Sequence, residues 1–192
     1  MKTFLQRTIL FAVSALVAGQ ALAHAGPGHA HTLADGFVHP VTGWDHALVA
    51  LVVGLIAAQW REYAWRLPAL FIGGMTLGAT AGVILPVGSW IESGIVLSML
   101  AAGLLLSLPR QAAGGVLTAM AVVVIGFAGA AHGVVHGAEA GAQPLYLGGI
   151  LAGTLVLHGT GIALGRLLAS RPLLLRGIGV ATAAIGVGVL VN

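Results

Sequence analysis

The sequence predicts an all-α integral membrane protein, in which a cleavable signal peptide precedes a compact bundle of six transmembrane helices. Of its 192 residues, 58% are hydrophobic and only 7% are charged, which is too little charge for the surface of a soluble domain. Apolar segments long enough to cross hydrocarbon recur after residue 40, separated by short breaks. The 30 glycines agree with this prediction, because helices in a bilayer pack closely through small residues.

Residues 1–23 have the pattern of a secretory signal peptide. Lys2 and Arg7 precede the apolar stretch "TILFAVSALVAG", and the small residues Ala21 to Ala23 offer a cleavage site before His24. The alternative is an uncleaved first helix. Cleavage would leave residues 24–40 as a His-bearing periplasmic N-terminal segment and residues 41–192 as the six-helix transmembrane domain.

The six predicted spans cover residues 41–60, 67–85, 91–108, 112–136, 145–168 and 173–191. Glycines at four-residue spacing recur within them, and we expect these rows to be helix contacts inside the bundle. The rows are Gly74, Gly78 and Gly82; Gly129, Gly133, Gly137 and Gly141; Gly149 and Gly153; and Gly161 and Gly165. A homo-oligomer is compatible with such rows but is not required by them.

Charge divides the chain into two sides. Every arginine after the signal peptide falls at one side of the predicted membrane: Arg61, Arg66, Arg110, Arg166, Arg171 and Arg176. The positive-inside rule makes this side cytoplasmic, so both mature termini are periplasmic in a bacterial inner membrane. Four carboxylates occupy the other side, where they would concentrate divalent cations: Asp35, Asp45, Glu92 and Glu139. The alternative is that acids simply populate the side where arginines are disfavoured.

Other partners and chemistries are excluded by composition. The scattered basic residues form no patch for nucleic acid. The absence of cysteine excludes thiolate metal sites and disulfides.

The stretch "HPVTGWDHALV" places His39, Asp45 and His46 at the mouth of the first span. His39 and His46 are two helical turns apart and share a face if the helix reaches back that far, although Pro40 favours a helix that begins just after His39. An ionisable residue at the centre of a span costs about 2.5–3.5 kcal/mol, so adjacent ones indicate a function. The alternative is that Asp45 caps a turn and His46 bonds to a neighbouring helix.

The stretch "AHGVVHGAE" supplies a second cluster at the same membrane level. His132, His136 and Glu139 lie on one face of a helix, with a spacing that metal ligands often have. We therefore expect the two stretches to converge on a cation site. Imidazole and carboxylate without sulfur suit Ni²⁺, Co²⁺, Zn²⁺ or Cu²⁺.

Five further residues are weaker candidates for metal binding. His158 lies in the middle of a span and is a ligand, a relay or a structural hydrogen-bonding group. Glu92 either completes the cation site or is a helix N-terminal carboxylate. His24, His29 and His31 would capture the ion first, unless they belong to a tail without function.

The block "GFVHPVTGWDHALVALVVG" resembles the signature of the HupE/UreJ nickel/cobalt permeases, and "AHGVVHGAE" resembles the fourth-span motif of that family. The signal peptide, the six spans and the segments "LPALFIGGMTLGATAG" and "IESGIVLSMLAAGLLL" are also similar. The resemblance implies that His39, Asp45, His46, His132, His136 and Glu139 are critical for transport. Two positions depart from the family pattern: Ala131 replaces a usual Phe, and Ala50 replaces a common Met.

The predicted function is that of a non-enzymatic inner-membrane permease. It moves Ni²⁺, with Co²⁺ as second candidate, from periplasm to cytoplasm, and it needs no prosthetic group. Its partners are the ion and the lipid bilayer, and the resemblance suggests hydrogenase or urease maturation as the destination of the metal. No nucleotide-binding motif of the GxxxxGK[ST] type is present. The alternatives are an intramembrane zinc-dependent hydrolase that uses the same His/Asp cluster, and a structural subunit.

Overall fold

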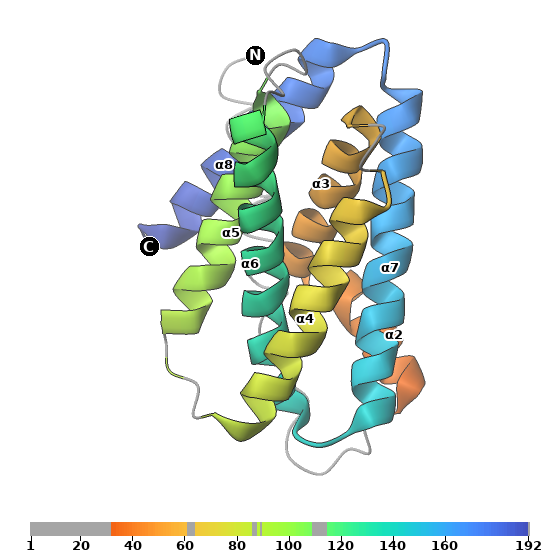
Figure 1. The fold of residues 1–192 in the computed structure, drawn as a ribbon, viewed down its shortest axis with the longest axis vertical. Coiled ribbons are helices and arrows are strands. Elements are labelled where there is room, and N and C mark those ends of the chain that lie inside the picture. Colours follow the sequence, from red (N-terminus) through yellow and green to blue (C-terminus); the bar gives the residue numbers. More distant parts are fainter. Residues whose placement is uncertain (1–31, 61–63, 86–87, 89, 109–114, 192) are drawn as a thin grey trace, which may run out of the picture.

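The computed structural model describes residues 32–60, 64–85, 88, 90–108 and 115–191. The predicted signal peptide and the candidate ligands His24, His29 and His31 lie outside these residues. The described residues form seven helices and no strand, which confirms the all-α prediction (Figure 1). The helices are α2 (Leu33–Thr42), α3 (Trp44–Gln59), α4 (Arg66–Ile84), α5 (Trp90–Ser107), α6 (Gly115–Ala140), α7 (Pro144–Leu167) and α8 (Pro172–Leu190).

Four of these helices, α4, α6, α7 and α8, are long and apolar enough to cross a membrane. The pair α2 and α3 passes the same test as one span that is bent by 81°. The apolar stretch of α5, Ile91–Ser107, is shorter. The described part of the chain therefore has four or five candidate spans, as expected of a helical membrane protein.

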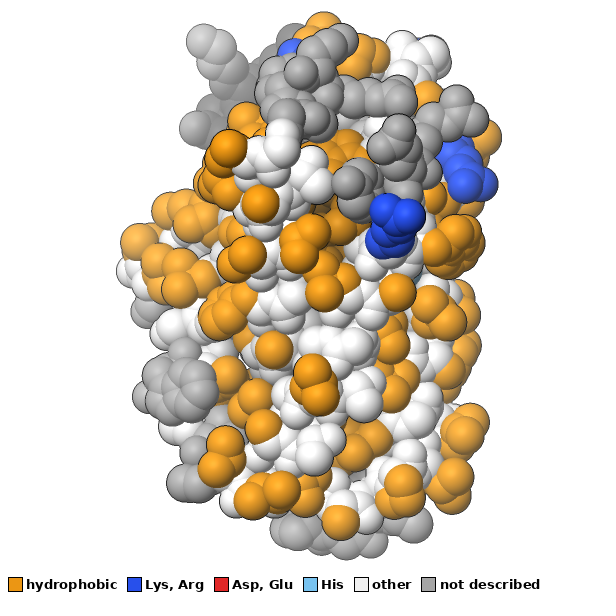
Figure 2. Space-filling view, in the orientation of Figure 1, with side chains coloured by type: hydrophobic (Ala, Val, Ile, Leu, Met, Phe, Trp, Pro, Cys, Tyr) orange, Lys and Arg blue, Asp and Glu red, His pale blue; other side chains and the backbone are white. Residues whose placement is uncertain are grey.

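The two ends of the bundle differ in charge. Arg66 begins α4, Arg166 lies in the last turn of α7 and Arg171 precedes α8, and all three helix ends lie at the upper end of Figure 1. Glu139, near the end of α6, lies at the opposite end. On the face shown in Figure 2, hydrophobic side chains cover the length of the bundle and the Lys and Arg side chains are confined to the upper part. This distribution suits a bundle surrounded by hydrocarbon.

Glycines allow α4 and α6 to pack with their backbones in contact. A Cβ atom on Gly78 or Gly82 of α4 would overlap backbone atoms of α6, and one on Gly133 or Gly137 of α6 would overlap backbone atoms of α4. The prediction that these rows are helix contacts is confirmed. Gly141 is the exception, because it contacts no other helix and ends α6 with a positive φ of 57°.

Glycines also build the second group of helices, in which α2 and α3 both pack on α7. Gly149 and Gly153 of α7 lie against the backbone of α2, and Gly161 lies against that of α3. A third pair joins α5 to α8 through Gly103 and Gly179. Contacts of α3 with α4 and of α6 with α7 are sparse by comparison.

The first helix of the membrane domain begins earlier than Pro40 predicts. Pro40 lies inside α2 and is buried, and the chain is helical from Leu33. Thr32 and Asp35 form a capping box at the start of α2, in which each side chain bonds to the other residue's backbone N–H. The helix continues for two residues beyond Pro40 and ends at Gly43, whose backbone N–H bonds to the carbonyl oxygen of His39. The expected start just after His39 is therefore wrong.

Candidate metal site

The break at Gly43 positions the first histidine motif. His39 lies in the last turn of α2, whereas Asp45 and His46 lie in the first turn of α3. The two histidines therefore do not share the face of one continuous helix. The bend instead folds α2 back so that the rings of His39 and His46 lie 6.0 Å apart, measured between centroids. Broken helices of this kind form ion sites in secondary transporters.

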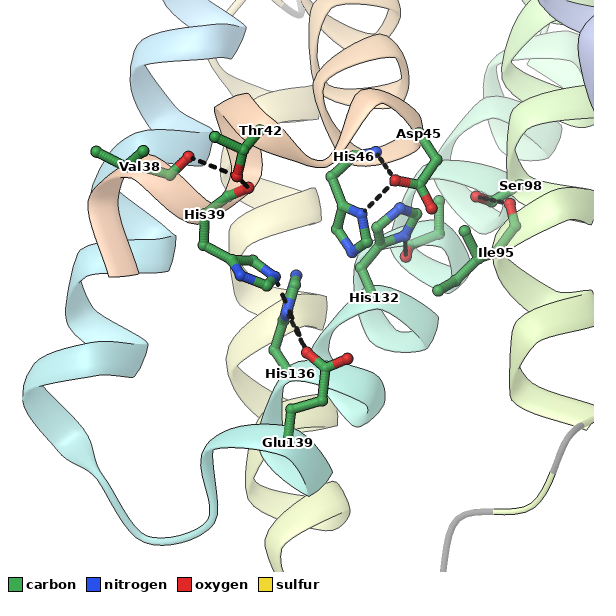
Figure 3. A network of polar contacts seen from close by, with 11 residues as sticks. Val38, His39, Thr42, Asp45, His46, Ile95, Ser98, His132, His136 and Glu139 are labelled. Atoms are coloured by element: carbon green, nitrogen blue, oxygen red, sulfur yellow. Dashed lines mark hydrogen bonds and ion pairs between the residues drawn. The ribbon is translucent and has the colours of Figure 1, made fainter. Parts of the chain in front are cut away.

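The close packing of α6 on α4 positions the second motif. His132 and His136 are one turn apart on α6, and their exposed fractions are 2% and 0%. Gly133 and Gly137, the residues that follow them, contact the backbone of α4. This contact fixes α6 close to its neighbour and leaves its histidine face towards the break between α2 and α3 (Figure 3).

The two motifs meet as a continuous row of imidazoles. The ring of His136 lies 5.0 Å from that of His39 and 4.6 Å from that of His46. The ring of His46 in turn lies 4.7 Å from that of His132. Convergence of the two stretches, which the sequence predicts, is thus present in the structure.

One end of this row has the geometry of a loose metal site. His39 Nε2 lies 3.9 Å from Glu139 Oε2, and His136 Nδ1 lies 3.6 Å from the same oxygen. One ligand atom from each of these residues lies within 4.8 Å of the others. Bonds of about 2.0–2.1 Å to a tetrahedral ion would place such atoms about 3.4 Å apart. The three ligand atoms would have to move closer together by up to about 1.4 Å to bind an ion.

Glu139 is the exposed member of the triplet. The exposed fraction of its side chain is 39%, against 18% for His39 and 0% for His136. An ion that arrives from this end of the bundle would therefore meet the carboxylate first and the buried imidazoles afterwards.

Hydrogen bonds fix the tautomer of two histidines in the row. His46 Nδ1 lies 2.8 Å from Asp45 Oδ1, and His132 Nδ1 lies 2.8 Å from the carbonyl oxygen of Ala128. A carboxylate and a carbonyl can only accept, so in both rings Nδ1 donates and Nε2 keeps its lone pair. Both Nε2 atoms are buried without a hydrogen-bond partner. Metal-binding histidines have this arrangement, with one nitrogen held by an acceptor and the other directed at the ion.

The side chain of Asp45 accepts hydrogen bonds from its neighbour in sequence, His46. Its Oδ1 accepts from both the backbone N–H, at 2.9 Å, and Nδ1 of His46. The exposed fractions of the two side chains are 17% and 13%. The structure thus joins Asp45 and His46 in one unit at the start of α3.

The weaker candidates lie away from the row. Glu92 is exposed in the first turn of α5 and is not among the residues whose ligand atoms converge in the described part of the chain. Asp35 is exposed and caps α2. His158 is fully buried in α7, and its Nδ1 lies 2.8 Å from the carbonyl oxygen of Ala50.

Sequence reasoning missed two aromatic neighbours of the histidines. The hydroxyl of Tyr146 lies 3.0 Å from His39 Nδ1. The buried ring of Phe71 lies 5.6 Å from the ring of His132 and 5.0 Å from that of His158. Neither residue belongs to a recognisable polar pattern, and only the packing of α4 and α7 brings them to the site.

An apolar groove also reaches the site. It has a volume of about 450 Å³ and runs between α4 and α7, with Met75, Ala79, Leu147 and Leu151 in its walls. His136 is the histidine that contributes to its lining. The buried imidazole row is therefore bordered by hydrophobic surface on this side.

Comparisons with known proteins identify the family of the chain. The family model described as HupE / UreJ protein matches residues 11–189. The protein named Protein HupE from Rhizobium leguminosarum bv. viciae is 35% identical over 162 residues, which cover 80% of this chain and 81% of that protein. No solved structure matches. The chain is a membrane protein of the HupE/UreJ family.

Proposed function

We propose that this protein is a permease that moves Ni²⁺, with Co²⁺ as second candidate, from the periplasm to the cytoplasm across a bacterial inner membrane. Membership of a family of nickel and cobalt transporters supports the general function. The observation that carries the proposal is the buried row of imidazoles, in which two Nε2 lone pairs have no partner. Borderline divalent ions prefer such nitrogen ligands.

The proposed topology has a cleaved signal peptide and six spans, with the bent pair α2–α3 as the first span and the short α5 as the third. Both mature termini are then periplasmic. The separation of the described arginines from Glu139 along the bundle supports this orientation through the positive-inside rule.

Each residue of the site has a role in this proposal. Glu139, His39 and His136 replace the first waters of the ion, and His46 and His132 receive it next through Nε2. Asp45 holds the His46 ring in the binding tautomer. Conduction requires binding that is strong enough to admit the ion and weak enough to release it, so we expect a site of modest affinity.

The site resembles a transport site more than a catalytic one. A zinc hydrolase needs an ion that stays in place with an open position for water. Membership of a transporter family gives the hydrolase no support. Delivery of the metal to hydrogenase or urease maturation is part of the proposal.

The test is uptake of radioactive Ni²⁺ by transporter-deficient cells that express the chain, with excess Co²⁺ or Zn²⁺ as competitor. His46→Ala should abolish uptake at unchanged abundance in the membrane. Thr182→Val, which removes a buried hydroxyl in α8 that bonds within its own helix, is the matched control and should leave uptake unchanged. Wild-type uptake equal to that of the empty vector, together with a tightly bound metal in the purified protein, would exclude the permease and favour the hydrolase.

A further inference from the structure

Among the residues that the structure describes, His158 is the fully buried histidine outside the row, and its hydrogen bond uses only one of its two ring nitrogens. Its Nδ1 donates across the helix interface, from α7 to the carbonyl oxygen of Ala50 on α3, at 2.8 Å. The carbonyl can only accept, so Nε2 carries the lone pair. This nitrogen is buried and has no hydrogen-bond partner.

A buried acceptor without a donor is unfavourable by about 1–3 kcal/mol. If the only role of His158 were to join α7 to α3, a side chain with a single donor would achieve this without the unpartnered nitrogen. The same arrangement, with Nδ1 held and Nε2 buried and unpartnered, occurs at His46 and His132. The shared geometry indicates a shared role as a ligand.

His158 lies farther from the Glu139 end of the bundle than the imidazole row does. From the start of α7 at Pro144, which lies at the Glu139 end, His158 is about 21 Å along the helix axis at 1.5 Å per residue. On α6, His132 is only about 10 Å from Glu139 by the same measure. His158 is therefore deeper in the bundle than the row, and about 12 Å short of Arg166 at the far end of α7.

Phe71 of α4 lies between the two positions. Its ring contacts both His132 and His158, with an edge-to-face arrangement at His158 and an interplanar angle of 82°. The exposed fraction of Phe71 is 2%. Phe71 is thus the shared neighbour of the two imidazoles.

We propose that His158 is a second binding position for the transported divalent transition-metal ion, on the inward side of Phe71, where Nε2 receives the ion after His132 releases it. This inference rests on the proposed function. A single imidazole binds more weakly than a cluster, so this position holds the ion only transiently, and successive weak positions are what rapid conduction requires.

Two substitutions separate a ligand from a structural hydrogen-bonding group. In His158→Asn the amide nitrogen falls close to the place of Nδ1 and can still donate to Ala50, but no atom remains at the place of Nε2. In His158→Gln the amide reaches the place of Nε2 and the imidazole is lost. Thr182→Val is again the matched control for a buried polar residue.

The experiment measures uptake of radioactive Ni²⁺ over a range of concentrations, and Ni²⁺ binding to the purified protein in detergent by calorimetry. For His158→Asn we expect a maximal rate that is lower by about tenfold or more, the usual scale for the loss of a group that supports a metal. The KM and the Kd at the outer cluster should stay within about twofold of the wild type. This combination indicates an ion that binds normally and fails to move inward.

Other outcomes overturn the proposal. A maximal rate for His158→Asn within twofold of the wild type would show that the hydrogen bond to Ala50 is sufficient. A Kd that weakens in parallel with the rate would place His158 in the support of the outer cluster. If His158→Asn does not accumulate in the membrane, His158→Gln is judged by the same criteria. Absence of uptake by the wild type would instead refute the proposed function itself, and this inference with it.

Discussion

The pairing of Asp45 with His46 makes a quantitative prediction about Ni²⁺ affinity. Asp45 Oδ1 accepts a hydrogen bond of 2.8 Å from His46 Nδ1, and both side chains are more than four-fifths buried. A hydrogen bond to a charged group contributes about 1.5–3 kcal/mol, and 1.4 kcal/mol corresponds to a tenfold change in Kd. Asp45→Ala should therefore weaken Ni²⁺ binding by about 10- to 100-fold.

Asp45→Asn should have a smaller effect. Its side-chain carbonyl oxygen can still accept from His46, and a neutral hydrogen bond is about half as strong as a charge-assisted one. The expected loss is then about three- to tenfold in Kd. Titration of the purified protein with Ni²⁺ in a calorimeter measures both variants, and Asp35→Asn is the control. Asp35 is an exposed carboxylate whose capping role an asparagine preserves.

The comparison of the two variants decides the role of Asp45. If Asp45 binds the ion directly, Asn and Ala should be equally harmful, because both remove the anionic ligand. Equal losses in the two variants would refute the positioning role. Wild-type affinity in Asp45→Ala would refute any role for Asp45 in binding.

Two further predictions concern packing and protons. Gly137→Ala should destabilise the protein by about 1–3 kcal/mol, because the added Cβ would overlap the backbone of Ala79. Gly148→Ala is the control, because its Cβ would enter open space and should leave stability unchanged or raise it. Thermal unfolding in detergent measures the stability of both variants. Ni²⁺ uptake should fall as the external pH is lowered, because the ligands must be deprotonated to bind the ion and protons compete for them; uptake independent of pH would contradict histidine and carboxylate ligands.

The sequence predicts which residues form the site better than it predicts how the backbone around them is arranged. The spacing of His132, His136 and Glu139 on one helix, and their membrane level, are local properties that a regular helix fixes. Their meeting with His46 follows from the shared level, and the structure confirms it. The bend at Gly43 could not be predicted in the same way, because α2 is held by contacts of Gly149 and Gly153 on a helix more than a hundred residues later.

Local signals for α2 were nevertheless present. Thr32 and Asp35 have the spacing of a capping box, which marks the start of a helix at Leu33, well before Pro40. Proline favours the first turn of a helix, so Pro40 predicts a helix start, whereas in the structure it lies near a helix end. The roles of Tyr146 and Phe71 have no such signal, since a lone aromatic residue in an apolar helix is usually core.

The imidazoles of the row belong to two groups of helices that make fewer backbone contacts with each other than within each group. His39 and His46 are carried by α2 and α3, which are packed on α7, whereas His132 and His136 are carried by α6, which is packed on α4. An ion that bonded to one imidazole from each group would cross-link the two groups of helices. The loaded protein would then be stiffer than the empty one, and release of the ion would restore the freedom of the two groups to shift against each other. Binding of the ion would therefore reduce the flexibility of the helix bundle, and release would restore it.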